Sequence, residues 1–156
     1  MRSELLIRPA VRHDAEAISR VIVRALRETN AQDYPPEIIA SVATNFSPER
    51  VSELMGAREV LVAVLTDEVV GTASLQGAVI RTVFIAPDHQ ARGIGTALMQ
   101  ELERRARQGG IAHLMVPSSI TAERFYAKLG FSAIRDEYHG AERTIIMQKV
   151  LGEAAP

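Results

Sequence analysis

The amino-acid sequence predicts a mixed α/β fold in which helices flank one sheet. Its 156 residues, of which 47 % are apolar and 24 % charged, suit one globular domain with a sizeable core. Segments with apolar side chains three and four positions apart alternate with short runs rich in β-branched residues. Three such runs follow one another across short polar connections, which favours antiparallel pairing. We expect a single domain over residues 1–151 and a flexible tail over 152–156.

The first half of the chain is expected to contain one strand and three helices. In order, these are a strand over residues 5–8, a helix from Asp14 to about Thr29, a helix from Pro36 or Glu37, and a helix over residues 47–56. Asp14 and Ser47 are residue types that cap helix N-termini, and Gly56 suits a helix end.

The second half is expected to supply most of the sheet. In order, it contains strands over residues 60–65, 69–75 and 79–85, a helix from Gly93 or Gly95 to Gln108, a strand over 111–116, a helix over 121–129, and strands over 132–136 and 144–149. Gly109 and Gly110 end the long helix, and Gly130 caps the short one. The resulting order is β-α-α-α-β-β-β-α-β-α-β-β.

Composition excludes several classes of partner. The formal net charge of −1, from 18 basic and 19 acidic residues, gives no electrostatic basis for binding nucleic acid. The chain has no cysteine, so it forms no disulfide and has no thiolate nucleophile. No apolar run approaches the roughly 20 residues of a membrane helix, so we expect no membrane partner and a cytoplasmic location. The four histidines lack the spacing of metal ligands, and we expect no metal.

The most informative segment is residues 83–98, where a strand and a polar loop lead into a helix through Gly93 and Gly95. The first N–H groups of a helix have no intrahelical acceptor and lie at the positive end of its dipole, so they form an anion site. Glycines let a phosphate approach the main chain, although they would equally form a tight turn. The pattern is not a Walker A motif, and it lacks the third glycine of a dinucleotide fingerprint.

Two spaced motifs resemble the GNAT superfamily of N-acetyltransferases. Gln90-x-x-Gly93-x-Gly95 resembles its acetyl-CoA loop, and residues 122–131 resemble its Ala-x-x-Phe/Leu-Tyr-x-Lys-x-Gly-Phe segment. Residues 146–149 are similar to the last strand of many members. The resemblance implies a mixed, mostly antiparallel sheet of about six to seven strands that is splayed at the acetyl-CoA site. It also implies acetyl-CoA as co-substrate and a homodimer as an expected assembly.

The resemblance further assigns residues to the cofactor. The implied contacts are Val83, Phe84, Ile85, Gln90, Ala91, Arg92, Gly93, Ile94, Gly95, Thr96, Ser119 and Tyr126. Main-chain N–H groups over 90–96 would hold the pyrophosphate, and the main chain of Phe84 and Ile85 would pair with the pantetheine arm like another strand. An N–H near residues 83–85 would polarise the thioester carbonyl. Ser119 stands where many members have Asn.

Tyr126 is the expected catalytic residue. The resemblance implies that its phenol acts as general acid and protonates the departing coenzyme A thiolate. Spacing alone would also suit a core aromatic that packs beside Phe125. The expected reaction is acetyl transfer to a small primary amine by direct attack in a ternary complex. A non-catalytic module that binds or senses acetyl-CoA, and an enzyme that acetylates protein N-termini or lysines, remain alternatives.

The acceptor side is less defined in the sequence. Asn30 and Tyr34 lie on the loop where the family builds its acceptor pocket, although Tyr34 beside two prolines would equally serve as a rigid anchor. An attacking amine must lose a proton, and the strand before the phosphate loop has no acidic residue to accept it. The candidate bases are Asp33, Glu37, Glu137 and His139. Residues 137–142 are predicted to form a solvated turn.

Overall fold

The computed structural model describes residues 4–152, and it confirms the predicted order of helices and strands. The elements are β1 (Leu5–Pro9), α1 (Ala15–Glu28), α2 (Pro36–Ala43), α3 (Pro48–Ala57), β2 (Glu59–Leu65), β3 (Glu68–Gln76), β4 (Val79–Ile85), α4 (Ile94–Gln108), β5 (His113–Ser118), α5 (Glu123–Lys128), β6 (Ser132–His139) and β7 (Glu142–Val150). Four short 3-10 turns, η1 (Arg12–Asp14), η2 (Asn30–Gln32), η3 (Thr44–Phe46) and η4 (Pro87–His89), lie between them. Residues 153–156 of the predicted tail lie outside the described residues.

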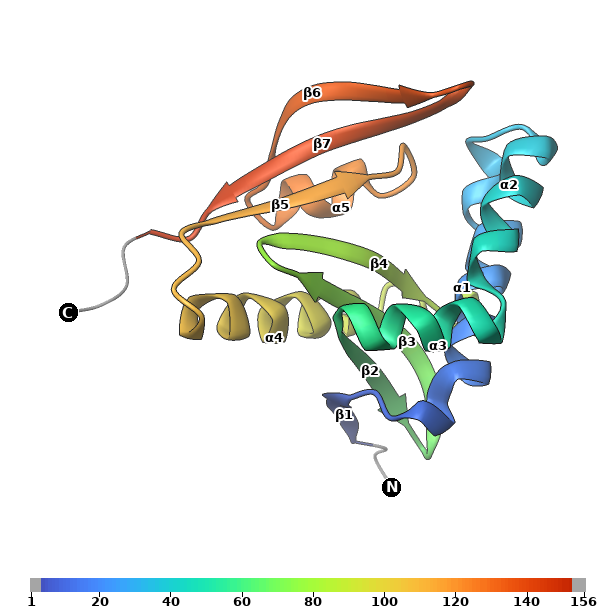
Figure 1. Ribbon diagram of the computed structural model, residues 1–156, viewed down its shortest axis with the longest axis horizontal. Helices are drawn as coiled ribbons and strands as arrows, with labels where there is room; N and C mark the ends of the chain where they lie inside the picture. The colour runs from blue at the N-terminus through green and yellow to red at the C-terminus, as the bar shows by residue number, and fades with distance from the viewer. Residues whose placement is uncertain (1–3, 153–156) are drawn as a thin grey trace.

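The seven strands form one mixed sheet in the order β1-β2-β3-β4-β5-β7-β6. Every neighbouring pair is antiparallel except β4 and β5, which are parallel and joined only at Val79 and Met115. The Met115 N–H donates to the Ala78 carbonyl at 3.0 Å, and beyond this point the two strands diverge. Figure 1 shows β5, β7 and β6 separating from the other strands. The predicted splay is therefore confirmed.

Helices cover both faces of the sheet because the strands alternate their side chains. On β2, Leu61 and Ala63 face the cluster formed with α4 and α5, whereas Val62 faces the cluster formed with α1, α2 and α3. The α4 residues Leu98 and Leu102 are fully buried, as their spacing of four residues predicts. Within residues 4–152, no helix combines the length and apolarity that a membrane crossing requires.

The predicted start of α1 is confirmed, and the predicted end of α3 is one residue early. Asp14 occupies the N-cap position of α1 but makes no capping hydrogen bond with its side chain, because its carboxylate accepts the Val11 N–H at 2.8 Å and two hydrogen bonds from Arg8. Gly56 does not end α3, which continues to Ala57. The prediction for Ser47 is confirmed, since its hydroxyl accepts the Arg50 N–H at 3.3 Å and so caps α3.

The strand predicted over residues 111–116 lies at His113–Ser118 instead. Ile111 belongs to the helix end, where its N–H donates to the Ala106 carbonyl at 3.0 Å. Pro117 does not stop the strand. The Met115 N–H points toward β4, so the nitrogen of residue 117 points to the same side, where β4 has already diverged. A proline there loses no hydrogen bond of the sheet.

The turn predicted over residues 137–142 is also wrong. Strand β6 extends to His139 and β7 begins at Glu142, so only Gly140 and Ala141 connect them. Most side chains of β6 are exposed, because it is an edge strand, and its sequence therefore lacks the alternation that marks a half-buried strand. Glu142 therefore lies at the start of a strand that borders the site.

Candidate functional site

The loop between β4 and α4 forms a cradle of unpaired main-chain amides. Ala91 and Gly93 both have left-handed backbone conformations, with φ of 61° and 78°, which curl the loop into a concave nest. The first hydrogen bond of α4 runs from the Ala97 N–H to the Gly93 carbonyl at 3.0 Å. Within residues 4–152, the amides of residues 91–96 have no acceptor. These amides and the helix dipole together suit an anion such as a diphosphate.

Gly93 and Gly95 are each required for a different structural purpose. Gly93 provides the left-handed turn, and a Cβ atom there would meet no other atom within 4 Å. At Gly95, by contrast, a Cβ would lie 3.0 Å from Cζ of Phe125. Gly95 therefore allows α4 to pack against α5, which the sequence motif alone does not reveal. Gln90 supports the loop from outside, because its side-chain amide donates to the Ile85 carbonyl at 3.0 Å.

A cavity of about 310 Å³ lies over this cradle, and we call it the loop-side cavity. The predicted cofactor contacts that line it are Val83, Phe84, Ile85, Gln90, Ala91, Gly93, Ile94, Gly95, Thr96 and Tyr126. Arg92 is exposed beside it and Ser119 lies elsewhere. His89 also lines the cavity, and its Nδ1 atom is buried without a hydrogen-bond partner in the described structure. An orphaned polar atom beside free amides fits a polar ligand.

Strand β4 presents main-chain groups to the loop-side cavity, and one of them, the Ile85 carbonyl, also accepts the Gln90 side-chain amide. The Ala86 N–H donates to Val70 of β3 at 2.8 Å, so strand alternation turns the main-chain groups of Val83 and Ile85 away from β3 and toward the splay. Phe84, whose main chain was predicted to pair with the pantetheine arm together with that of Ile85, instead pairs with Thr72 and faces β3. A bulge precedes them, with Thr82 in a left-handed conformation at a φ of 56°. Such strain in a β-branched residue concentrates at functional sites. An extended ligand arm has a strand edge available here.

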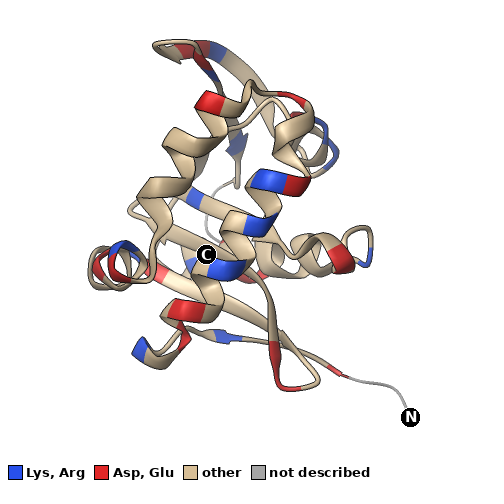
Figure 2. Cartoon of the chain, turned by 90° about the vertical axis from the view of Figure 1, so that its right-hand side faces the viewer, with Lys and Arg blue, Asp and Glu red and all other residues tan. Residues whose placement is uncertain are grey.

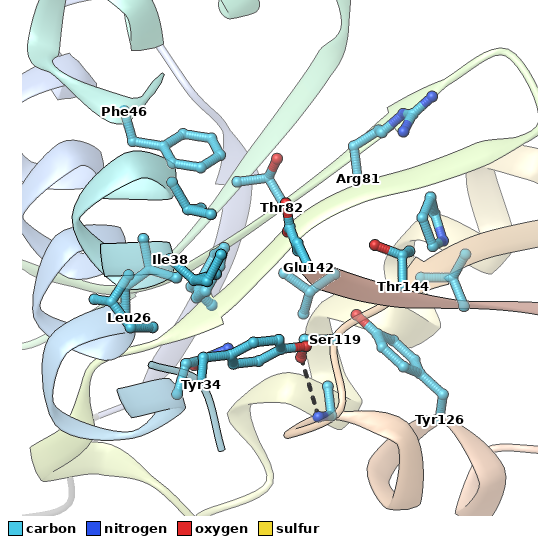
Figure 3. A pocket seen from close by; sticks show the side chains of 18 of the residues that line it. Leu26, Tyr34, Ile38, Phe46, Arg81, Thr82, Ser119, Tyr126, Glu142 and Thr144 are labelled. Atoms are coloured by element: carbon cyan, nitrogen blue, oxygen red, sulfur yellow. Dashed lines mark hydrogen bonds between the residues drawn. The ribbon is translucent and has the colours of Figure 1, made fainter. Parts of the chain in front are cut away.

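A second cavity, of about 320 Å³, lies on the other side of β4, and we call it the helix-side cavity. Figure 3 shows apolar side chains of the helical segments, including Leu26, Ile38 and Phe46, on one side of it. Across from them lie polar side chains of β4 and β7, among them Arg81 and Glu142.

Asn30 and Tyr34 both line the helix-side cavity, where the sequence placed the acceptor. The Tyr34 hydroxyl accepts the Ile120 N–H at 2.6 Å and donates to the Arg143 carbonyl at 3.3 Å. Burial raises the pKa of Tyr34, so the hydroxyl keeps its proton for that bond. This tyrosine ties the η2–α2 loop to the β5–α5 loop and to β7. Its ring is a wall of the cavity, and its hydroxyl is already occupied.

Tyr126 lies where the two cavities meet. It lines both of them, as do Val83, Phe84 and Ala122. Its ring is 4 % exposed and packs edge-on against Phe125, at 5.1 Å between centroids, and against Phe131 at 5.8 Å. Burial raises the pKa of Tyr126, which keeps the phenol protonated at neutral pH. Tyr126 therefore packs in the core, which is one of the two roles that the sequence left open, and it also borders both cavities.

Ser119 lines the helix-side cavity, not the loop-side cavity. Its hydroxyl accepts the Ala122 N–H at 3.1 Å and so supports the start of α5. Its position thus separates it from the predicted cofactor contacts, and its hydrogen bond gives it a local structural role.

Glu142 is the residue that sequence reasoning missed. It is the only Asp, Glu or His among the residues that line the helix-side cavity within the described chain. The candidate bases Asp33, Glu37, Glu137 and His139 do not line this cavity. No local signal could have found Glu142, because it begins a strand far from both motifs and only the fold brings it to β4.

An open mixed sheet, with an amide cradle at a helix N-terminus and a buried tyrosine between two cavities, is the arrangement that the sequence motifs predict for an acyltransferase. The family profile of the acetyltransferase (GNAT) domain matches residues 30–150, so the chain belongs to this family. The uncharacterized N-acetyltransferase YafP of Escherichia coli K12 is 27 % identical over 124 residues, which cover 80 % of this chain and 79 % of that protein. The chain is therefore an acetyltransferase.

Solved structures agree with this assignment. The GCN5-related N-acetyltransferase from Rhodopseudomonas palustris has a TM-score of 0.90 and 27 % identity, with 97 % of this chain and 98 % of that chain covered. The PaiA N-acetyltransferase from Thermoplasma acidophilum, solved in complex with coenzyme A, has a TM-score of 0.79 and 21 % identity, with 94 % of this chain and 99 % of that chain covered. At its lower identity, the second likeness concerns the fold alone.

Proposed function

We propose that this acetyltransferase transfers the acetyl group of acetyl-CoA to the primary amine of a small molecule, by direct attack in a ternary complex. The observation that supports this most is the shared wall of the two cavities. Val83, Phe84, Ala122 and Tyr126 border both, so two ligands that enter from opposite sides meet beside the same tyrosine. Direct attack needs such a meeting point, since it requires the reacting atoms within about 3–3.5 Å of each other.

In this proposal the loop-side cavity holds acetyl-CoA, which supplies an activated thioester. The free amides of residues 91–96 bind the pyrophosphate. The main-chain groups of Val83 and Ile85 pair with the pantetheine arm. An N–H of this strand edge donates to the thioester carbonyl oxygen, an interaction that in other acyl transfers contributes about 3–4 kcal/mol per donor.

Two side chains, Glu142 and Tyr126, transfer protons in this proposal. Glu142 accepts the proton of the amine, directly or through water, because it is the carboxylate of the helix-side cavity. Tyr126 donates its proton to the departing sulfur. Because burial raises the pKa of Tyr126, its loss of a proton does not limit the rate at any pH below about 10.

Thiol release from acetyl-CoA over a panel of primary amines tests the proposal. Tyr126→Phe is expected to lower kcat by about 10²- to 10⁴-fold, the usual contribution of general acid catalysis, with little change in coenzyme A affinity by calorimetry. Tyr138→Phe is the matched control, because Tyr138 is an exposed residue of β6 outside both cavities. Absence of coenzyme A binding would refute the site. Binding without thiol release from any amine would identify a non-catalytic module.

A further inference from the structure

Two arginines of the helix-side cavity have no carboxylate partner. Arg58 follows α3 and Arg81 lies on β4, and both line the cavity. One side-chain nitrogen of Arg58 donates to the Thr82 hydroxyl at 3.1 Å, and the Arg81 guanidinium has no hydrogen bond or ion pair within residues 4–152. The Nε atoms of both are buried without a hydrogen-bond partner in the same part of the chain. Five-donor cations left in this state are rare in folded proteins.

The other arginines of the described chain show how unusual this pair is. Those with an ion-pair partner are Arg8, Arg24, Arg50, Arg104, Arg105, Arg135 and Arg143. The remaining arginines among residues 4–152 are exposed to solvent, except Arg58 and Arg81, which are half-buried. Burial, and then the neighbouring charge of Arg81, lower the pKa of Arg58. The fold therefore holds two like charges together, partly removed from water, which is unfavourable unless an anion joins them.

The rest of the cavity defines what else such a ligand contains. Apolar side chains of the helical segments, among them Leu26, Ile38 and Phe46, face the strands across the cavity (Figure 3). Glu142 is in no ion pair within the described residues, so it remains available to a positively charged amine. The cavity thus offers a cationic wall, an apolar wall and one carboxylate. These three features are complementary to a carboxylate, an apolar body and an ammonium group on one small molecule.

On the basis of the proposed function, we infer that the acceptor is an apolar amino acid, an amine whose carboxylate is bound by Arg58 and Arg81 and whose side chain packs against the helical wall. Guanidinium groups bind carboxylates through paired, charge-assisted hydrogen bonds, which neutral analogues do not form. Selectivity then arises from the anion and the apolar body together, and the amine remains free to face Tyr126.

Matched acceptors that differ only in the carboxylate test this inference. L-Phenylalanine is compared with phenethylamine, and L-leucine with 3-methylbutylamine, by kcat/KM for thiol release at one pH. We expect the amino acid of each pair to be preferred by at least tenfold. Arg81→Met and Arg58→Met should each lower kcat/KM for the amino acid by about 10- to 100-fold, the value of one charged hydrogen bond, and change that for the neutral amine less than threefold. Arg20→Met, at an exposed site on α1, is the control and should change neither.

Binding gives a second readout that does not depend on turnover. In the coenzyme A complex, calorimetry should detect N-acetyl-L-phenylalanine more readily than N-acetylphenethylamine, and Arg81→Met should remove the difference. Equal binding, or equal loss for both acceptors, overturns the inference. Preference for neutral amines with normal turnover would refute this inference and leave the proposed function intact.

Discussion

The two cavities on either side of β4 are built by different parts of the chain. The loop-side cavity is lined mainly by residues 83–96 and by α5, and its polar groups are mostly main-chain amides. The helix-side cavity draws side chains from segments between residues 26 and 144, and its polar groups are arginine, glutamate and hydroxyl side chains. A main-chain site binds an invariant ligand whatever side chains surround it. A site built from side chains can change its ligand through single substitutions. The loop-side cavity therefore suits a ligand common to many related proteins, and the helix-side cavity suits a ligand selected by this chain.

The strongest test of this contrast is a substitution that distorts the cradle without removing a charge. We expect Gly93→Val to weaken coenzyme A binding by at least about tenfold, because a branched side chain at a φ of 78° strains the turn that orients the amides of residues 91–96. Arg92→Ala should change the affinity by less than about fivefold, because an exposed charge contributes at most about 1 kcal/mol. Calorimetry of coenzyme A measures both.

Gly77→Val is the matched control for strain. Gly77 also has a left-handed conformation, with a φ of 59°, and a Cβ there would meet no atom within 4 Å. It lies in the turn between β3 and β4, outside both cavities. Its variant should lose similar stability and keep coenzyme A affinity. If Arg92→Ala weakened binding more than Gly93→Val, the cradle would depend on side chains and the contrast would fail.

A smaller effect is expected at the helix-side cavity, where Tyr34 links the η2–α2 loop to the β5–α5 loop. Tyr34→Phe leaves the Ile120 N–H without its acceptor at 2.6 Å and loosens the η2–α2 loop from the β5–α5 loop. We expect KM for the amine to rise by about three- to tenfold, in line with the roughly 0.5–1.5 kcal/mol net contribution of a hydrogen bond. Coenzyme A affinity should change less than twofold. A change confined to coenzyme A would show that the two cavities are not separable.

The same contrast explains how much of the molecule could be read from the sequence. Strand β4 and the end of α4 fall at the predicted residues, because a short run rich in β-branched residues and a pair of glycines mark them locally. Most of the predicted cofactor contacts line one cavity, because a main-chain site needs only a strand, two glycines and a helix in succession. Both regions consist of contiguous residues, and contiguous residues carry their own structural signal.

What the sequence did not reveal depends on contacts between distant segments. Glu142, Arg58 and Arg81 meet at one cavity only because β7 and β4 lie on the two sides of the splay. The strand predicted over residues 111–116 continues through Pro117, because a proline is tolerated there only where β4 has already diverged beside it. Gly95 is required by the ring of Phe125, which lies thirty residues further along the chain. None of these relations has a periodicity or spacing from which it could be derived.

The smallest expected effect is that of Glu101→Gln, which should lower the stability of α4 without changing coenzyme A binding at the N-terminus of that helix. Glu101 accepts hydrogen bonds from Arg104 and then Arg105, which lower its pKa from a usual value near 4.5 to about 2. A lowered pKa means that the pairs stabilise the fold above about pH 4.5 and that this contribution is lost as the pH falls toward 2. Glu101→Gln should therefore reduce the free energy of unfolding by about 0.5–1 kcal/mol at pH 7, after solvent screening, and by nearly nothing near pH 2.

Urea unfolding at the two pH values measures this difference, and Glu53→Gln is the control, because the Arg50–Glu53 pair is mostly exposed and should contribute little at either pH. Coenzyme A affinity of Glu101→Gln should equal that of the wild type at pH 7. The amides of residues 91–96 stay unpaired at the start of α4 whatever charge lies two turns further along, because the dipole at a helix end is dominated by its first turn. A loss of affinity in this variant would mean that the helix as a whole, and not its first turn, holds the anion.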